Sequence, residues 1–214
     1  SEDAEIATLL AGSETVRGRG EAAIGHLERA LSYDSQSWPA LQLLIELQAR
    51  RGSLDEALEL AMRFERAQPT NPAAVLLLGD VFIASQRLND GVAAYERVME
   101  GGADEARFAA TLKLARVRIT QGEVKEAETL IEEALRLNPR NDAGFLLAAD
   151  LARLQGKAGA ELTFVQKAVD VSPRSLAALL RLGNVHLARG DIRRANKAAS
   201  GAKAVSATDA RVML

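Results

Sequence analysis

Few side chains in this chain of 214 residues have types and spacings that suit catalysis or metal binding. The absence of cysteine excludes a disulfide, a thiolate metal site and a cysteine nucleophile. The two histidines, His26 and His186, lie near opposite ends of the chain, so we expect no shared acid–base pair and no His-based metal site. Carboxylate pairs such as Glu132 and Glu133 fit the solvated face of a helix. We therefore predict that the protein is not an enzyme and has no catalytic residue, metal or cofactor.

One short motif resembles a phosphate-binding loop. The run Gly18-Arg19-Gly20-Glu21-Ala22-Ala23 matches the glycine pattern G-x-G-x-x-A of dinucleotide-binding proteins. That pattern requires a preceding strand and a βαβ unit, whereas the residues before Gly18 have helical spacing. A turn between two helices explains both glycines, so the sequence disfavours nucleotide binding.

The charge of the chain also limits its partners. The formal net charge is -2, from 27 basic and 29 acidic residues, which provides no overall field toward nucleic acid or anionic lipid. Residues 176–214 are basic, but no aromatic residue follows Phe164, and single-strand readers usually interleave aromatic and basic side chains. The apolar runs are shorter than the ~20 residues of a membrane span. We therefore disfavour a nucleic-acid partner and expect no membrane insertion.

A period of 34 residues organises the whole sequence. Glycine recurs with this period, except that Gln86 occupies the glycine position of the third repeat. Two extra residues lie near Gly101-Gly102 and lengthen the spacing there. A small or apolar series and a proline series follow the same period. The three series, in chain order, are Gly18, Gly52, Gly122, Gly156 and Gly190; Ala30, Phe64, Val98, Ala134, Ala168 and Ala202; and Pro69, Pro139 and Pro173. The pattern therefore predicts six repeats, at residues 4–37, 38–71, 72–105, 108–141, 142–175 and 176–209.

Each repeat has the pattern of two helices. Good N-cap residues, among them Asn71, Asn141 and Ser175, stand just before most repeats, and Asp104 suits a helix that begins slightly early in the fourth repeat. About fourteen residues with helical apolar spacing then lead to the turn glycine, which suits a left-handed C-terminal cap. No alternating strand pattern occurs, so we predict an all-α protein of helical hairpins.

This unit resembles the tetratricopeptide repeat (TPR) family, whose repeat is a 34-residue helix–turn–helix. Two positions that hold small residues in the family also hold small residues in most repeats of this chain. The exceptions are Ile45 and Glu161, and we expect Glu161 to shift the local packing onto Ala160. The first site holds Ala11, Gly79, Ala115, Ala149 and Gly183, and the second holds Ala23, Ala57, Gly91, Ala127 and Ala195. The resemblance implies a right-handed α-solenoid over residues 1–214 in one domain, because each hairpin buries its apolar stripe only against its neighbours.

The resemblance also implies a binding groove. In the family, the first helix of each repeat lines the concave face, and matching its exposed positions gives three rows of groove residues in the middle of this chain. The predicted partner-binding residues are Leu76, Asp80, Ile83, Leu112, Lys113, Arg116, Leu146, Asp150, Arg153 and Asn184. Asp80, Arg116 and Asp150 would form a charge ladder beside an exposed strip of leucines, and such strips usually mark interaction sites. The alternative is that the leucines pack partly between helices and that the charges pair only with each other.

Two functions are compatible with this interpretation. The first is a protein–protein interaction scaffold that binds a peptide or partner protein in its concave groove. The second is a regulatory or assembly segment of a larger enzyme or of an envelope or polysaccharide-export machine, packed against other domains. In composition the repeats are similar to bacterial multi-repeat proteins of the envelope and export type.

The C-terminal residues generate a prediction of their own. Asp209 suits the cap of a further helix that starts in residues 210–214, so we expect the parent protein to continue and to be longer than this chain. Val212, Met213 and Leu214 would leave that stub apolar. We predict weak self-association through this end, measured by light scattering at high concentration against a chain that stops at Ala207. Identical monomer behaviour of the two chains would contradict it.

Overall fold

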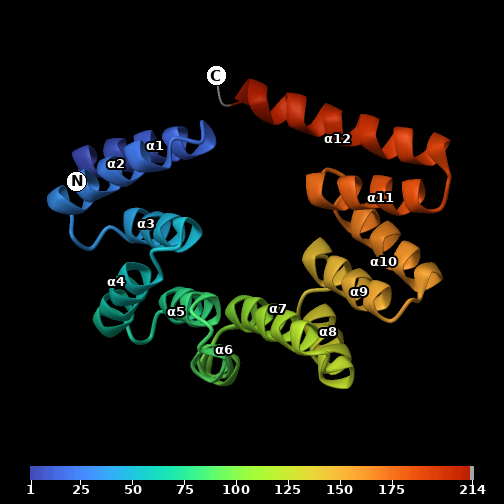
Figure 1. The fold of residues 1–214 in the computed structure, drawn as a ribbon, viewed down its shortest axis with the longest axis horizontal. Helices are drawn as coiled ribbons and strands as arrows, with labels where there is room; N and C mark the ends of the chain where they lie inside the picture. The colour runs from blue at the N-terminus through green and yellow to red at the C-terminus, as the bar shows by residue number, and fades with distance from the viewer. Residues whose placement is uncertain (213–214) are drawn as a thin grey trace. The chain divides into compact units, whose positions relative to one another are not determined.

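The fold consists of twelve α-helices in the part of the chain that is described. The structure is a computed structural model that describes the backbone of residues 1–212 and the side chains of residues 1–207. The helices alternate along the chain between the first (A) and second (B) helix of each repeat (Figure 1). The A helices are α1 (Glu2–Val16), α3 (Trp38–Arg51), α5 (Pro72–Ala84), α7 (Asp104–Gln121), α9 (Asp142–Leu154) and α11 (Leu176–Ala188). The B helices are α2 (Gly20–Tyr33), α4 (Leu54–Ala67), α6 (Leu88–Gly101), α8 (Val124–Leu137), α10 (Ala158–Val171) and α12 (Ile192–Val212). This confirms the all-α helical-repeat fold.

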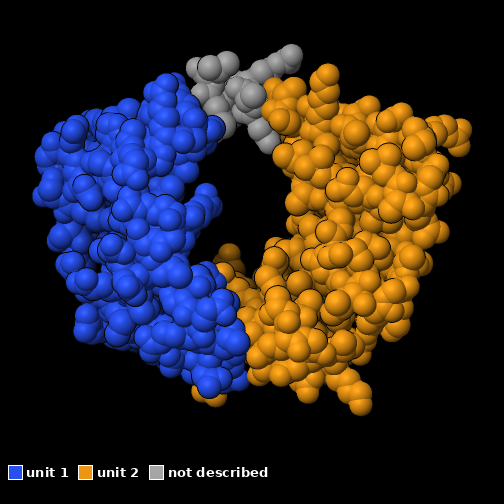
Figure 2. Space-filling model, viewed as in Figure 1, with its two compact units in different colours: residues 1–98 blue, residues 99–214 orange. Residues whose placement is uncertain are grey.

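The chain divides into two compact units. Unit 1 contains residues 1–98 and unit 2 contains residues 99–214 (Figure 2). The division falls in the last turn of α6, just before the two extra residues of the sequence pattern. Within unit 1, the A helices α3 and α5 pack on the B helices before them, α2 and α4; within unit 2, α9 and α11 pack on α8 and α10 in the same way.

Helix ends follow the caps that the sequence provides. The side chains of Asn71 and Asn141 accept hydrogen bonds from the backbone N–H two residues ahead, at 3.0 and 2.9 Å, as N-caps do. Five turn glycines have a left-handed backbone, and Gln86, in the sixth slot, adopts the same conformation with φ 62°. A residue that has a Cβ is strained in this conformation by about 1–2 kcal/mol. Gln86 adopts it nevertheless, so the hairpin requires a left-handed turn residue even where glycine is absent.

Complementary volumes bring the two helices of each hairpin together. A small residue in the A helix faces a large one in the B helix, as Gly79 faces Tyr95: a Cβ built on Gly79 would lie 2.5 Å from Tyr95 Cε1. The second repeat reverses the volumes, because the buried Ile45 packs against Ala61 in one core cluster. The sixth repeat is an exception, because both of its residues are small. The pairs at these two sites are Ala11 and Leu27, Ile45 and Ala61, Gly79 and Tyr95, Ala115 and Ile131, Ala149 and Val165, and Gly183 and Ala199.

The last helix differs from the expectation for the C-terminal end. Its backbone continues without a break through Asp209 to Val212, so no new helix is capped there. At the three positions where other B helices cover the next repeat, α12 carries Asn196, Ala199 and Lys203, whereas α10 carries Leu162, Val165 and Val169. The outer face of α12 is therefore polar. The side chain of Val212 and residues 213–214, on which the self-association prediction depends, lie outside the described residues.

The volume pairs predict opposite effects of one substitution at two equivalent sites. Gly79→Ala forces the buried ring of Tyr95 to move, so we expect it to lower the free energy of unfolding by about 1–3 kcal/mol. Gly183→Ala is the matched control, because its Cβ would lie 3.7 Å from the nearest atoms. It should raise stability by up to ~1 kcal/mol through helix propensity. Urea unfolding measures both, and equal effects would contradict the volume argument.

Candidate functional site

Three predicted groove residues lie on α5 of unit 1. Leu76 is buried, with 9% of its surface exposed, so the expected exposed leucine strip does not include it. Ile83 is half-buried and packs over Gly91, where an added Cβ would lie 2.5 Å from Ile83 Cδ1. Asp80 accepts a hydrogen bond from Tyr95 Oη at 2.8 Å. Burial raises the pKa of Tyr95 above its usual range and the charge of Asp80 adds to the shift, so the phenol stays neutral and keeps donating this bond.

The other seven predicted residues lie on the A helices of unit 2. We call the exposed surface of α7, α9 and α11 the A-helix face of unit 2. Three predicted residues are exposed on this face: Arg116, Arg153 and Asn184. Leu180 and Leu187 are also exposed there, each by about half. The remaining predicted residues on these helices are half-buried: Leu112, Lys113, Leu146 and Asp150.

A cluster of charged side chains replaces the expected ladder in this unit. Asp150 on α9 accepts a hydrogen bond from Arg181 on α11 and lies 3.8 Å from Arg153. Arg181 Nε also lies 3.8 Å from Glu161 Oε1 on α10, and the Glu161 side chain is only 13% exposed. The Asp150 partner is therefore Arg181, which was not predicted from the sequence. The sequence feature that indicates Arg181 is Glu161. A carboxylate at a buried position that holds a small residue in the other repeats requires a cation nearby.

A cleft opens beside this cluster. It has a volume of about 620 Å³, and Arg153, Arg181, Asn184 and Arg189 line it together with Glu161. Arg189 donates a hydrogen bond to the carbonyl of Ala158 at the start of α10, at 3.4 Å, which ties α11 to the neighbouring hairpin. Because Asp150 and Glu161 offset only part of the positive charge, the cleft presents arginine and amide donors to an acceptor-rich partner.

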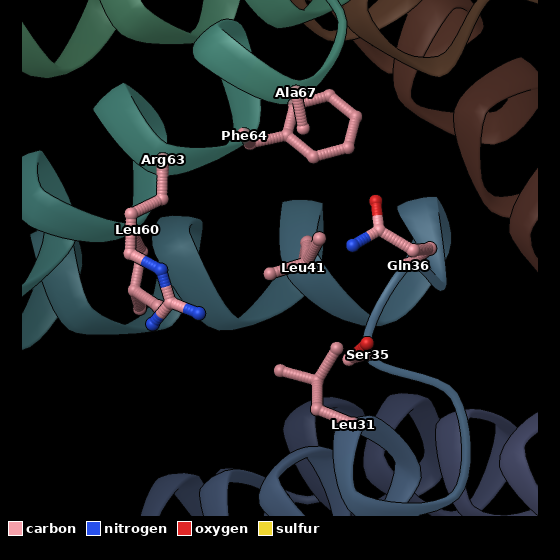
Figure 3. A pocket seen from close by; sticks show the side chains of 8 residues that line it. All are labelled: Leu31, Ser35, Gln36, Leu41, Leu60, Arg63, Phe64 and Ala67. Atoms are coloured by element: carbon pink, nitrogen blue, oxygen red, sulfur yellow. The ribbon is translucent and has the colours of Figure 1, made fainter.

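Unit 1 contains a smaller cleft between α2, α3 and α4. It has a volume of about 190 Å³, and Leu31, Leu41 and Leu60 contribute most of its apolar lining (Figure 3). Phe64, which also lines the cleft, stacks on Trp38 with ring centroids 4.4 Å apart. The space is too small for a typical ligand site of about 300–1,000 Å³.

The residues considered for chemistry lie in structural positions. His186 is buried, with 6% of its surface exposed, and the glycine motif at Gly18 forms the turn between α1 and α2. Among the described residues, no three His, Cys, Asp or Glu side chains are placed to hold a metal ion. In the same part of the chain, no helix has the length and apolar character of a membrane span.

Comparison with known proteins identifies the family. The sequence profile described as "Tetratricopeptide repeat" matches residues 13–72 and 112–175, more than half of the chain. The protein therefore belongs to the tetratricopeptide repeat family, as the 34-residue period predicts. No curated protein sequence matches the chain.

Solved structures of similar fold share little sequence with it. PilW, described as a widely conserved type IV pilus biogenesis factor, matches with a TM-score of 0.66 and 18% identity, covering 95% of this chain and 94% of PilW. Pseudomonas aeruginosa PilF matches with a TM-score of 0.63 and 18% identity, over 92% and 89% of the two chains. MamA from Desulfovibrio magneticus RS-1 matches with a TM-score of 0.53 and 18% identity, over 78% and 94%. At this identity, the likeness shows the fold alone.

The charged cluster generates a stability prediction. Arg181→Leu leaves the carboxylates of Glu161 and Asp150 without their shared cation, and we expect it to lower the free energy of unfolding by about 1–3 kcal/mol. Adding Glu161→Ala restores the small residue of the other repeats and should recover most of that loss. Arg153→Leu is the control and should cost at most ~0.5 kcal/mol, because Arg153 is 63% exposed. Urea unfolding of the three variants measures this; a double variant no more stable than Arg181→Leu would contradict it.

Proposed function

We propose that the protein is an interaction scaffold whose A-helix face in unit 2 binds a segment of a partner protein. The observation that carries the proposal is the cleft of about 620 Å³ on this face, since two of the residues that line it, Arg153 and Asn184, were predicted as groove residues from the repeat. Membership of the tetratricopeptide repeat family supports a role in protein–protein interaction.

The face combines apolar anchors with unpaired charge. Leu180 and Leu187 are 50% and 53% exposed, so covering them would contribute about 1 kcal/mol each from the hydrophobic effect. Arg116 is exposed on α7, and it makes no ion pair with the residues that the structure describes. Charges of this kind mainly determine specificity and association rate. In unit 1, Asp80 and Ile83 hold the equivalent positions of α5, and we propose them as partner-binding residues of that unit by itself.

We favour this function over that of an assembly segment packed against other domains of a larger protein. The reason is that membership of the tetratricopeptide repeat family supports a role in protein–protein interaction, and the cleft that Arg153 and Asn184 line offers donors to a partner segment.

Charge reversal on the A-helix face tests the proposal. A partner is first captured from the source cells with the unaltered protein, and its affinity is then measured by titration calorimetry. We expect Arg116→Glu and Leu180→Asp each to weaken binding at least tenfold, while Arg116→Glu costs at most ~1 kcal/mol of stability, because this side chain is exposed and unpaired.

Lys197→Glu is the matched control, because it reverses an exposed charge on the outer helix α12. It should leave the affinity unchanged. If it abolishes binding while Arg116→Glu and Leu180→Asp bind fully, the B-helix side is the working surface and the proposal fails.

A further inference from the structure

A second cleft lies in unit 2, and its lining shares no residue with that of the cleft on the A-helix face. It has a volume of about 440 Å³ and is enclosed by α8, α9 and α10. Ala148 and Ala152 of α9 are buried along it, while Leu135 of α8 and Phe164 of α10 contribute larger apolar side chains. Its volume is within the range of about 300–1,000 Å³ that is typical of ligand sites.

Two substitutions to alanine, one helical turn apart, explain why this repeat has a cleft. At the position of Ala148 the other five repeats carry leucine. Four of these leucines are buried, and the fifth belongs to the first repeat, which has no hairpin before it. At the position of Ala152 the other repeats carry longer side chains, of which Phe82 is the largest apolar one. Protein interiors are close-packed, so the loss of both side chains leaves space that the neighbouring helices have not closed. The leucines are Leu10, Leu44, Leu78, Leu114 and Leu182.

The rim of the cleft is acidic on one side. Glu128 and Glu132 are exposed and lie one turn apart on α8. Glu128 is held over the cleft because its carboxylate accepts a hydrogen bond from Gln155 Nε2 at 2.8 Å. Lys157 at the start of α10 is the one basic side chain of the lining, so the two carboxylates dominate the charge. An apolar floor under an acidic wall is complementary to an apolar side chain that is flanked by basic residues.

We propose that this cleft binds a large apolar side chain, such as tryptophan, of a partner peptide that carries arginine or lysine beside it. The apolar side chain fills the space above Ala148 and Ala152, and the basic neighbours pair with Glu128 and Glu132. Aromatic and arginine residues that enter a preformed pocket are the usual anchors of protein interfaces. The residues that line this site differ in kind from those of the A-helix face, which presents arginine and asparagine donors.

Capped pentapeptides test the proposal on the full chain. The probe acetyl-RAWAR-amide carries the apolar anchor between two arginines, acetyl-EAWAE-amide reverses the charges, and acetyl-RAGAR-amide lacks the anchor. Binding is followed by NMR of alanine methyl groups labelled with carbon-13. We expect RAWAR to shift the Ala148 and Ala152 methyl signals and to bind at least fivefold more tightly than EAWAE, while RAGAR causes no shift there. Equal affinity of RAWAR and EAWAE, or shifts located elsewhere, would overturn the proposal.

Filling the cleft gives the sharpest variant. Ala148→Leu introduces the residue of the other five repeats, so we expect an unchanged or higher melting temperature and at least a tenfold loss of RAWAR affinity. Ala143→Leu, the same change at an exposed site of α9, should bind RAWAR like the unaltered protein. Retained binding by a folded Ala148→Leu chain would refute the site.

Two further measurements distinguish a basic peptide from a different occupant of the cleft. The double variant Glu128→Lys, Glu132→Lys leaves the floor of the cleft intact and should reverse the preference, so that EAWAE binds more tightly than RAWAR. Sedimentation velocity identifies a second copy as the occupant: a dimer that Ala148→Leu converts to monomers would overturn the assignment to a basic partner peptide.

Discussion

The fold depends on how closely the two helices of each hairpin approach, and that distance is set by pairs of side chains whose volumes complement each other. Gly79 leaves room for the ring of Tyr95, and Ile45 in the second repeat is accommodated because Ala61 faces it. The sum of the volumes matters more than which helix contributes the larger residue, since interiors are packed at nearly constant density. Neighbouring hairpins can stack in register only when each crossing is filled, so the burial of the apolar stripe depends on these pairs.

The fifth repeat departs from this arrangement at two positions. Glu161 occupies a small-residue site, and a carboxylate that is only 13% exposed must be paired, which Arg181 of the next hairpin provides. Arg181 also binds Asp150, so one guanidinium joins α9, α10 and α11. In the same repeat, Ala148 stands where the other repeats carry leucine, and an apolar cleft opens there between α8, α9 and α10. The repeat that departs most from the pattern therefore contributes residues to both candidate binding surfaces.

The two surfaces of unit 2 differ in their chemistry. The A-helix face offers arginine and asparagine donors beside exposed leucines, which suits an acceptor-rich partner segment. The cleft over Ala148 offers an apolar floor and two carboxylates, which suits a basic segment with one large side chain.

The sequence alone determined the class of protein. The 34-residue period, the N-cap residues and the turn glycines are local signals, because backbone conformation and apolar spacing within a hairpin require only nearby residues. The sequence also predicted that Arg153 and Asn184 are exposed on A helices, since equivalent positions of a repeat face the same way. Only the tertiary structure decided that Leu76 is buried, that Asp150 pairs with Arg181 and that two alanines open a cleft. These outcomes depend on the distances between side chains of neighbouring hairpins, and a repeat pattern specifies which residues meet but not how closely they pack.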